Sequence, residues 1–181
     1  MTTRRDVLRA TGALVLAGVG SGFAGPAFAQ GLESQVRRLA FDNLHTGERV
    51  SVDYWTDGAY VPDALDCVNK VLRDFRTGDV HPIEPTLLDL LSLLRRRVET
   101  DSPIEVISGY RSPKTNAKLH EASSGVASNS LHMQGMAIDI RIPGCALPNL
   151  RKAALAMRAG GVGYYPKSNF VHVDVGRVRT W

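Results

Sequence analysis

The alternation of apolar and polar residues predicts two amphipathic helices in the first half of the chain. Apolar residues recur every three or four positions in the segments 62–76 and 84–100, which is the period of one helix face. They are Ala64, Leu65, Val68, Val71, Leu72 and Phe75 in the first segment and Leu87, Leu90, Leu91 and Leu94 in the second. Pro85 suits the first turn of the second helix. The three arginines 95–97 suit its last turn, where the helix dipole favours positive charge.

Shorter apolar segments predict strands. An N-terminal β-hairpin is expected from the arms 39–44 and 49–55, which flank a turn that contains Gly47. Further strands are expected at 104–110, 135–142, 161–165 and 169–176. Two more helices are expected, one at 111–121, with Ser112 as its cap and Pro113 at its first position, and one at 147–160.

The order of these elements predicts an α+β fold, with a small, mostly antiparallel central sheet, flanking helices and an N-terminal β-hairpin. The chain has 181 residues, of which 44% are hydrophobic and 22% charged, as is typical of a globular protein. Because this length suits one domain with its own core, a single domain is expected over residues 39–181.

Residues 1–29 have the pattern of a cleaved signal peptide. Arg4 and Arg5 precede a mildly apolar run that ends in small residues at Ala29, and the arginine pair is typical of a twin-arginine leader. The run is shorter than the ~20 apolar residues that span a membrane, although a retained anchor is the alternative. We expect export to the periplasm by the twin-arginine machinery, no stable membrane anchor after cleavage, and a linker at 30–38.

Charge and cysteine content add two limits. Removing residues 1–29, which hold three arginines and one aspartate, lowers the net charge from +4 to +2. The remaining arginines are scattered, so nothing predicts binding to nucleic acid. Cys67 and Cys145 can pair in an oxidising compartment or can be two small buried residues, and the sequence leaves both open.

The two strands that carry histidine and aspartate point these residues away from the core. Side chains alternate between the faces of a strand, so Met136, Ile138 and Ile140 lie opposite to Asp139. In the last strand, Val171, Val173 and Val175 lie opposite to His172 and Asp174. If the two strands are neighbours, Asp139, His172 and Asp174 converge on one surface of the sheet.

His132 lies in the loop before the Asp139 strand. Gly135 permits a sharp bend, and Ala137 is small enough to leave room beside Asp139. Two imidazoles and one carboxylate form a common catalytic zinc set that leaves one position open for water. A histidine and an aspartate on a strand can also be a hydrogen-bonded couple without metal. His45, His81 and His120 are expected to lie in surface positions.

Three motifs in order resemble the zinc peptidase superfamily of D-alanyl-D-alanine carboxypeptidases and murein endopeptidases. They are "SGYRSP", "SLHMQGMAID" and "FVHVDVG", and the likeness is strongest to the exported murein endopeptidase K branch over nearly the whole chain. The resemblance implies that His132, Asp139 and His172 bind one zinc ion. It also implies that Arg111 holds the substrate carbonyl as its oxygen becomes negative, which suits a guanidinium beside a metal.

The chain departs from many carboxypeptidase relatives at Asn169, where those relatives carry a glutamate that serves as general base. Asp174 is the carboxylate available on the His172 face, so we expect it to take the proton of the zinc water. The alternative is that Asp174 orients a histidine ligand.

We therefore expect a zinc metallopeptidase that hydrolyses amide bonds in peptidoglycan stem peptides or cross-links, of L,D or D,D type. Ser130, Tyr164 and Tyr165 are candidate substrate-binding residues, and Trp181 can line the same groove, although the aromatic residues can equally belong to the core. A zinc-containing module that binds cell-wall peptides without cutting them is the alternative. A metal-free structural protein is a third hypothesis.

Overall fold

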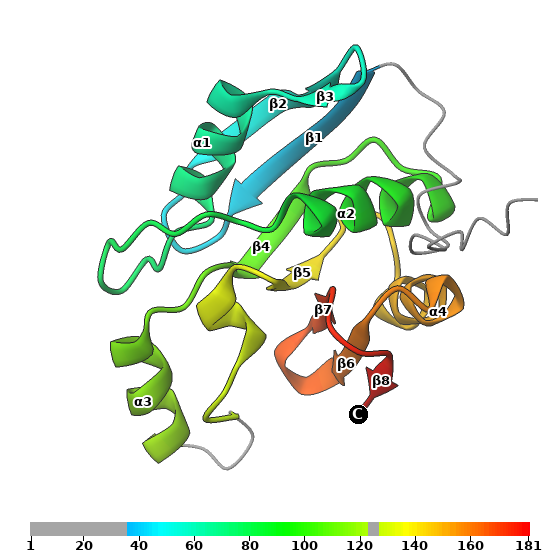
Figure 1. The fold of residues 1–181 in the computed structure, drawn as a ribbon. Coiled ribbons are helices and arrows are strands. Elements are labelled where there is room, and N and C mark those ends of the chain that lie inside the picture. Colours follow the sequence, from blue (N-terminus) through cyan, green and yellow to red (C-terminus); the bar gives the residue numbers. More distant parts are fainter. Residues whose placement is uncertain (1–35, 123–126) are drawn as a thin grey trace, which may run out of the picture.

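One eight-stranded sheet forms the centre of the computed structural model, which describes residues 36–122 and 127–181 (Figure 1). The strands are β1 (Val36–Asn43), β2 (Arg49–Thr56), β3 (Ala59–Tyr60), β4 (Ile104–Ser108), β5 (Ala137–Arg141), β6 (Gly161–Tyr165), β7 (Phe170–Asp174) and β8 (Arg179–Thr180). Their order across the sheet is β3-β2-β1-β4-β5-β7-β6-β8. The predicted α+β class is confirmed.

The sheet is mixed, which corrects the expectation of a small, mostly antiparallel sheet. β1 pairs in parallel with β4, and β6 pairs in parallel with β8. β4 follows β1 only after two strands and two helices, and such a long connection lets a strand return in the same direction. The local apolar pattern carries no information about this pairing. β3 and β8 are only two residues long, too short to show an alternation.

Of the four α-helices in the part of the chain that the structure describes, three pack against the sheet and one lies apart. α1 (Pro62–Val71) contacts β2, α2 (Pro85–Arg97) contacts β1, and α4 (Leu147–Met157) contacts β6 and β7. In Figure 1, α2 lies between α1 and α4, whereas α3 (Pro113–Ala122) is set away from them. Two short 3₁₀ helices, η2 (Leu131–Gln134) and η3 (Pro166–Ser168), precede β5 and β7.

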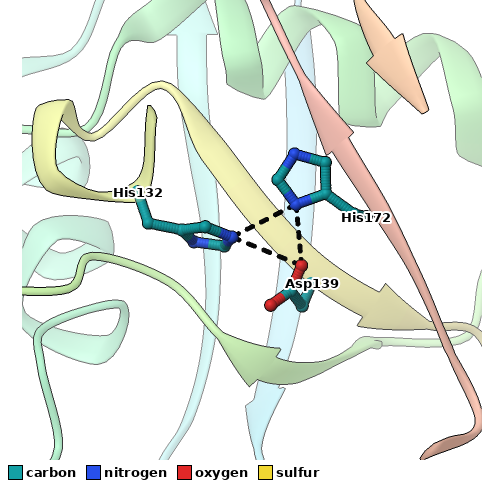
Figure 2. A group of neighbouring side chains, drawn as sticks. All are labelled: His132, Asp139 and His172. Carbon is teal, nitrogen blue, oxygen red and sulfur yellow. Dashed lines mark hydrogen bonds and ion pairs between the residues drawn. The ribbon is translucent and has the colours of Figure 1, made fainter. Parts of the chain in front are cut away.

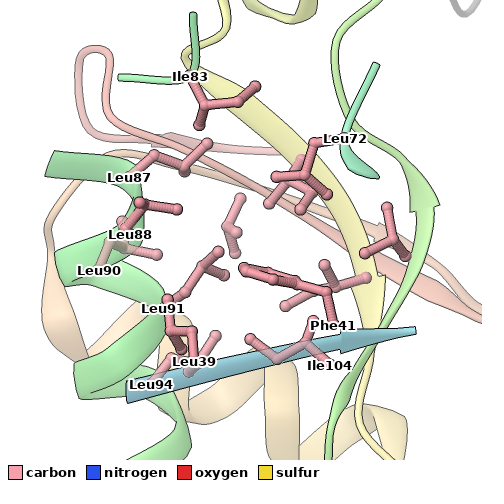
Figure 3. Close-up of a cluster of buried hydrophobic side chains, with 14 of the residues drawn as sticks. Leu39, Phe41, Leu72, Ile83, Leu87, Leu88, Leu90, Leu91, Leu94 and Ile104 are labelled. Atoms are coloured by element: carbon pink, nitrogen blue, oxygen red, sulfur yellow. The ribbon is translucent and has the colours of Figure 1, made fainter. Parts of the chain in front are cut away.

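The core lies between α2 and the sheet. Figure 3 shows the leucines of α2 facing Leu39 and Phe41 of β1 and Ile104 of β4. The predicted positions Leu87, Leu90, Leu91 and Leu94 are all buried, and arginines 95–97 occupy the last turn as expected. Burial of each such side chain stabilises the fold by about 1.5–3 kcal/mol. Packing on this face leaves the opposite face of β5 and β7 available for polar residues.

The first helix ends earlier than expected, at Val71 rather than near Arg76. Its last carbonyl groups find partners outside the helix, because the Asn43 side chain donates to Val71 O and the Tyr110 amide donates to Leu72 O. Phe75 is therefore not a core helix residue. Its ring stacks on His45 instead, with 3.9 Å between the ring centroids.

The expected leader, residues 1–29, lies outside the described residues, as does part of the expected linker. β1 already begins at Val36, inside the range 30–38 that was expected to be linker. Within residues 36–122 and 127–181, no helix has the length and apolar character needed to cross a membrane.

Asp89 of α2 ties the N-terminal strands to the core. Its carboxylate accepts hydrogen bonds from the Tyr54 hydroxyl at 3.0 Å, the Tyr60 hydroxyl at 2.7 Å and the Arg37 guanidinium at 2.9 Å. Burial, followed by this negative charge, raises the pKa of Tyr54, so the phenol stays a donor. The carboxylate itself is almost fully buried. Removing it takes away a shared acceptor of two tyrosine hydroxyls and one guanidinium.

We expect Asp89→Ala to lower the free energy of unfolding by about 3 kcal/mol, as is typical when one partner of a buried ion pair is removed. Urea denaturation followed by circular dichroism measures this. Asp53→Ala is the matched control, because Asp53 pairs with the largely exposed Arg38 on β1 and should matter far less. An equal loss of unfolding free energy in Asp89→Ala and Asp53→Ala would contradict the stabilising role assigned to Asp89.

Candidate metal centre

His132, Asp139 and His172 converge on one point of the sheet surface. β5 and β7 are antiparallel neighbours, and their register places Asp139 directly opposite His172. η2 brings His132 over the same place, as Figure 2 shows. One ligand atom from each residue lies within 4.8 Å of the other two, and all three side chains are buried. Within the described residues, this is the group that could hold a metal ion.

The turn around η2 explains how His132 reaches the sheet. The Ser130 hydroxyl accepts a hydrogen bond from the His132 amide, which caps the start of the 3₁₀ helix. Gly135 ends it with a φ of 67°, a left-handed conformation that glycine adopts without strain. A side chain at Gly135 would also meet Pro82 O at 2.2 Å. The sharp bend predicted at Gly135 is confirmed.

The outward nitrogen of each imidazole has a fixed acceptor. His132 Nδ1 lies 2.8 Å from Gly109 O, and His172 Nε2 lies 3.0 Å from Asp174 Oδ2. Carbonyl and carboxylate oxygens only accept hydrogen bonds, so each of these nitrogens carries the proton in the neutral ring. The neutral rings therefore present the lone pairs of His132 Nε2 and His172 Nδ1 to each other and to Asp139.

The three facing atoms form a triangle of suitable size for zinc. His132 Nε2 lies 3.2 Å from His172 Nδ1 and 3.3 Å from Asp139 Oδ1, and His172 Nδ1 lies 2.9 Å from Asp139 Oδ1. Zinc bonds of about 2.0–2.1 Å in a tetrahedron place neighbouring ligand atoms about 3.3 Å apart. A proton on His172 Nδ1 can form a hydrogen bond with one of the other two atoms, whereas a metal cation can bind all three atoms.

The surroundings of the triangle favour positive charge. Burial alone would raise the pKa of Asp139, but His132 and His172 outweigh it and hold this pKa well below its usual range. Burial likewise opposes a charged His172, but hydrogen bonds with Asp139 and Asp174 raise the pKa of this imidazole. The donor set and its electrostatics therefore both fit a bound cation.

Arg111 points toward this centre. Its Nη2 lies 3.7 Å from Asp139 Oδ2, and its Nη1 donates to Asn116 Oδ1 at 3.5 Å. Burial lowers the pKa of Arg111 and Asp139 raises it, and a guanidinium stays charged in such a place. The structure thus brings Arg111 and the three histidine and aspartate side chains together, as the sequence predicted.

Asp74 anchors the loop that carries Arg111. Its Oδ2 accepts hydrogen bonds from the Ser112 amide at 2.9 Å and the Ser112 hydroxyl at 2.7 Å. Burial opposes ionisation of Asp74, but hydrogen bonds from Thr115 and Ser112 outweigh it and lower its pKa to about 2. The same loop holds His132, because the Arg111 amide donates to His132 O and Gly109 O accepts from the ring. Asp74 lies beyond the end of α1 and was not anticipated from the sequence.

Asp174 is poorly placed to act as the general base that we expected. Its side chain has no exposed surface, and it lies on the Nε2 side of His172, away from the three facing ligand atoms. Both carboxylate oxygens are occupied, Oδ1 by the amides of Gly161 and Gly176 and by Arg179, and Oδ2 by His172 and Arg179. Burial would raise its pKa, but hydrogen bonds, first from His172 and then from Arg179, lower it well below its usual range. The geometry matches the alternative, an acceptor that orients His172.

A cavity of about 420 Å³ opens onto the three facing residues. Arg111, Ser130, Tyr165 and Trp181 line it together with His132, Asp139 and His172. Tyr164 does not line the cavity, because it points to the other face of β6. There the guanidinium carbon of Arg151, on α4, lies 4.9 Å from the centroid of the Tyr164 ring. Asn169 is an exposed residue at the turn before β7. Among the described residues that line the cavity, Asp139 is the one carboxylate.

The remaining candidates lie elsewhere. His45 stacks on Phe75 and His81 stacks on Tyr110, while His120 lies on the exposed side of α3. Cys67 and Cys145 are both free thiols. Arg179, which lines the cavity and binds Asp174, was not anticipated, because the two-residue strand β8 has no recognisable apolar pattern.

Comparison with known proteins finds relatives that match most of this chain. The sequence model of the family described as peptidoglycan L,D-endopeptidase MepK matches residues 32–181. The chain is 46% identical over 171 residues to the peptidoglycan L,D-endopeptidase MepK of Escherichia coli (strain K12), covering 93% of this chain and 94% of that protein. It is 44% identical over 146 residues to the probable peptidoglycan L,D-endopeptidase MepK of Haemophilus influenzae, covering 80% and 78% of the two chains.

Proposed function

The chain belongs to the peptidoglycan L,D-endopeptidase MepK family, and from this membership we propose that it is a zinc peptidase that cleaves L,D amide bonds in peptidoglycan cross-links. Its substrate is then a peptide of the cell wall, and its activity belongs to cell-wall remodelling. This choice narrows the expectation from the sequence, which left L,D and D,D bonds equally open.

One observation carries the proposal. Three lone-pair donors, His132 Nε2, Asp139 Oδ1 and His172 Nδ1, face one another at 2.9–3.3 Å on the floor of a cavity. In the neutral rings both nitrogens lack a proton on this side, because Gly109 O and Asp174 accept from the opposite nitrogens. Three such donors are held at this distance at little cost only around a cation.

These three residues would hold a zinc ion through Nε2, Oδ1 and Nδ1. When bound, zinc supplies Lewis acidity, which lowers the pKa of water to ~7 and polarises a carbonyl group. The backbone carbonyl of Gly109 and the carboxylate of Asp174 fix the two imidazole planes, and such outer contacts raise the basicity of the ligand nitrogens.

Arg111 supplies the second positive charge of the site. Its guanidinium is held beside Asp139 Oδ2 by the loop that Asp74 anchors. A substrate carbonyl that enters the cavity gains negative charge on its oxygen during attack by water, and a fixed cation stabilises this charge without reorganising. We assign Arg111 this role, and we assign Ser130 and Tyr165 to the wall that receives the substrate peptide.

We assign Asp174 the role of orienting His172. Asp174→Asn should therefore weaken zinc binding about 10- to 100-fold, the usual effect of losing such a contact, while excess zinc restores most of the activity. Excess zinc cannot compensate for a missing general base, and the loss of such a base typically costs about 10²–10⁴-fold in rate at any zinc concentration. A zinc titration of peptidase activity distinguishes the two roles.

Asp89→Asn serves as the control for that titration, because it removes another buried carboxylate that lies outside the cavity. It should leave the zinc dependence of activity unchanged. If Asp174→Asn stays inactive at saturating zinc while remaining folded, the orienting role is wrong and the role of base returns.

The proposed reaction is tested by digesting purified cross-linked muropeptides with the zinc-loaded protein and identifying the products by mass spectrometry. We expect new peptide ends from L,D-linked dimers and much slower release from D,D-linked dimers. Among the described residues, the cavity wall offers no carboxylate besides Asp139, which is the observation that favours the alternative of a non-catalytic zinc module. Binding of the dimers without any new peptide end would support that alternative.

The proposed substrate also locates the protein. Peptidoglycan lies outside the cytoplasmic membrane, so we propose a periplasmic protein exported by the twin-arginine machinery. The support for this route is the Arg4–Arg5 pair followed by a short apolar run in residues 1–29.

A further inference from the structure

The cavity wall contains a hydrogen-bonded pair of aromatic residues with a direct bearing on the reaction. We propose that the Tyr165 hydroxyl donates a hydrogen bond to the scissile carbonyl of the substrate, and that Trp181 positions this hydroxyl. This inference rests on the proposed peptidase function. It makes Tyr165 a catalytic residue that touches the substrate and Trp181 a positioning residue that acts through Tyr165.

The hydrogen bond within the pair sets the direction of the phenol proton. The indole Nε1 of Trp181 lies 2.7 Å from the Tyr165 hydroxyl oxygen, and an indole N–H can only donate. Trp181 therefore fills an acceptor position of the phenol oxygen. It is the hydroxyl's hydrogen-bond partner among the described residues, so the phenol's own proton is available to a ligand in the cavity.

The phenol ring is held in place by its neighbours. The Tyr165 ring stacks on Phe170 of β7 with 4.5 Å between the centroids. Both rings line the cavity next to His172, which follows Phe170 by two residues on the same face of β7. A donor fixed in this way needs no reorganisation when charge develops on the substrate.

The indole ring lies at the edge of the sheet, and Trp181 is 48% exposed. Its backbone is bound to β6, because the Trp181 amide donates to Val162 O and the Tyr164 amide donates to Trp181 O. Gly163 makes room for the ring, since a side chain there would begin 2.8–2.9 Å from the indole atoms. The Arg179 guanidinium lies 4.9 Å from the ring centroid, and His172 lies 5.1 Å from it.

The other polar groups of the wall are largely committed. Arg179 binds both oxygens of Asp174, and the Ser130 hydroxyl oxygen accepts a hydrogen bond from the His132 amide. Arg111 is directed toward Asp139. Asn129 lines the cavity but is exposed. The Tyr165 hydroxyl is thus an uncharged donor of this wall, with one acceptor position of its oxygen filled by Trp181.

Tyr165→Phe removes the donor and keeps the ring. We expect kcat on an L,D-linked dimer to fall about 100-fold, the scale for loss of one preorganised donor, while KM changes little. Zinc content should stay at the wild-type value, because the phenol is not a ligand. Tyr164→Phe is the matched control, since this adjacent tyrosine lies under Arg151 on the other face of β6 and should keep its activity.

Trp181→Phe keeps an aromatic ring but removes the indole N–H. We expect a fall in kcat of about threefold to tenfold, the worth of one neutral hydrogen bond. If Trp181 acts through Tyr165, the same change made in the Tyr165→Phe protein should cost nothing further.

The outcomes separate the claims. Full kcat in Tyr165→Phe overturns the catalytic role of the phenol. An equal cost of Trp181→Phe in both backgrounds overturns the positioning role. A zinc-loaded wild-type protein that releases no product overturns the proposed function, and this inference with it, whereas the first two results arise only when the wild-type protein is active.

Discussion

Replacing Asp139 with alanine is expected to remove the bound metal and nearly all peptidase activity. The change leaves two imidazoles, which are too few protein ligands for a catalytic zinc site. It also removes the carboxylate that lies 3.7 Å from Arg111. A zinc ion entering the site would then face the Arg111 guanidinium with no negative charge between the two cations. Because metal stabilisation of the transition state is worth several kcal/mol, we expect a fall in rate of at least about 10³-fold.

Two measurements check this expectation. Elemental analysis of the purified protein should give about one zinc ion per chain for the wild type and close to none for Asp139→Ala. Muropeptide digestion under the same conditions measures the rate. Asp53→Ala, which removes a half-buried carboxylate of β2 that lies outside the cavity, is the control and should retain both zinc and activity. Undiminished zinc content in Asp139→Ala would exclude this carboxylate as a ligand.

Replacing Arg111 with methionine should reduce kcat about 10²- to 10³-fold while zinc stays bound. The guanidinium contributes charge where the carbonyl oxygen becomes negative, and it contributes little to holding the metal. Arg111→Lys keeps the charge but not the planar, forked donor, so we expect it to recover only part of the loss. Steady-state kinetics on an L,D-linked dimer, with zinc content measured in parallel, separates these effects.

Arg151→Met is the matched control for Arg111. Arg151 is also a partly buried arginine, but it lies over Tyr164 on the opposite side of β6 from the cavity. Its loss should leave kcat unchanged. Wild-type kcat in Arg111→Met, or loss of zinc as complete as in Asp139→Ala, would contradict the role of stabilising the substrate's charge.

The sequence predicted the convergence of Asp139 and His172 well, because side chains on a strand alternate between its faces with a fixed period. In β5 and β7 the buried isoleucines and valines identify the core face, so Asp139 and His172 had to point to the other. The register then places these two residues directly opposite each other. Gly135 gave the remaining signal, since the left-handed turn it allows carries His132 over the sheet.

The same alternation could not reveal how completely the Asp174 side chain is buried. It places Asp174 on the face of His172 correctly, but it cannot show that Gly161, Gly176 and Arg179 enclose the carboxylate. Gly161 lies on β6 and Arg179 on β8, and Gly176 lies just after β7, so the occupied oxygens became visible only once these turns and strands were placed in the fold. The role assigned from the sequence therefore changed, from accepting a proton to orienting a ligand.

Three other differences between prediction and structure have separate causes. Applying the alternation to β6 would have separated Tyr164 from Tyr165, since adjacent strand residues cannot share a face. The parallel pairing of β1 with β4 depends on a long connection through α1 and α2, which no local pattern encodes. The helical period before Phe75 is interrupted because Asn43 and Tyr110 take the carbonyl groups of Val71 and Leu72.

The most direct test of a zinc peptidase at this site is removal and return of the metal. The protein is stripped with a chelator and titrated with zinc, and cleavage of an L,D-linked muropeptide dimer is followed by mass spectrometry. We expect cleavage to stop in the stripped protein and to return in proportion to zinc, up to one ion per chain. Cleavage that persists in protein shown to be free of metal, or returns in Asp139→Ala at the same zinc ratio, would contradict a centre formed by His132, Asp139 and His172.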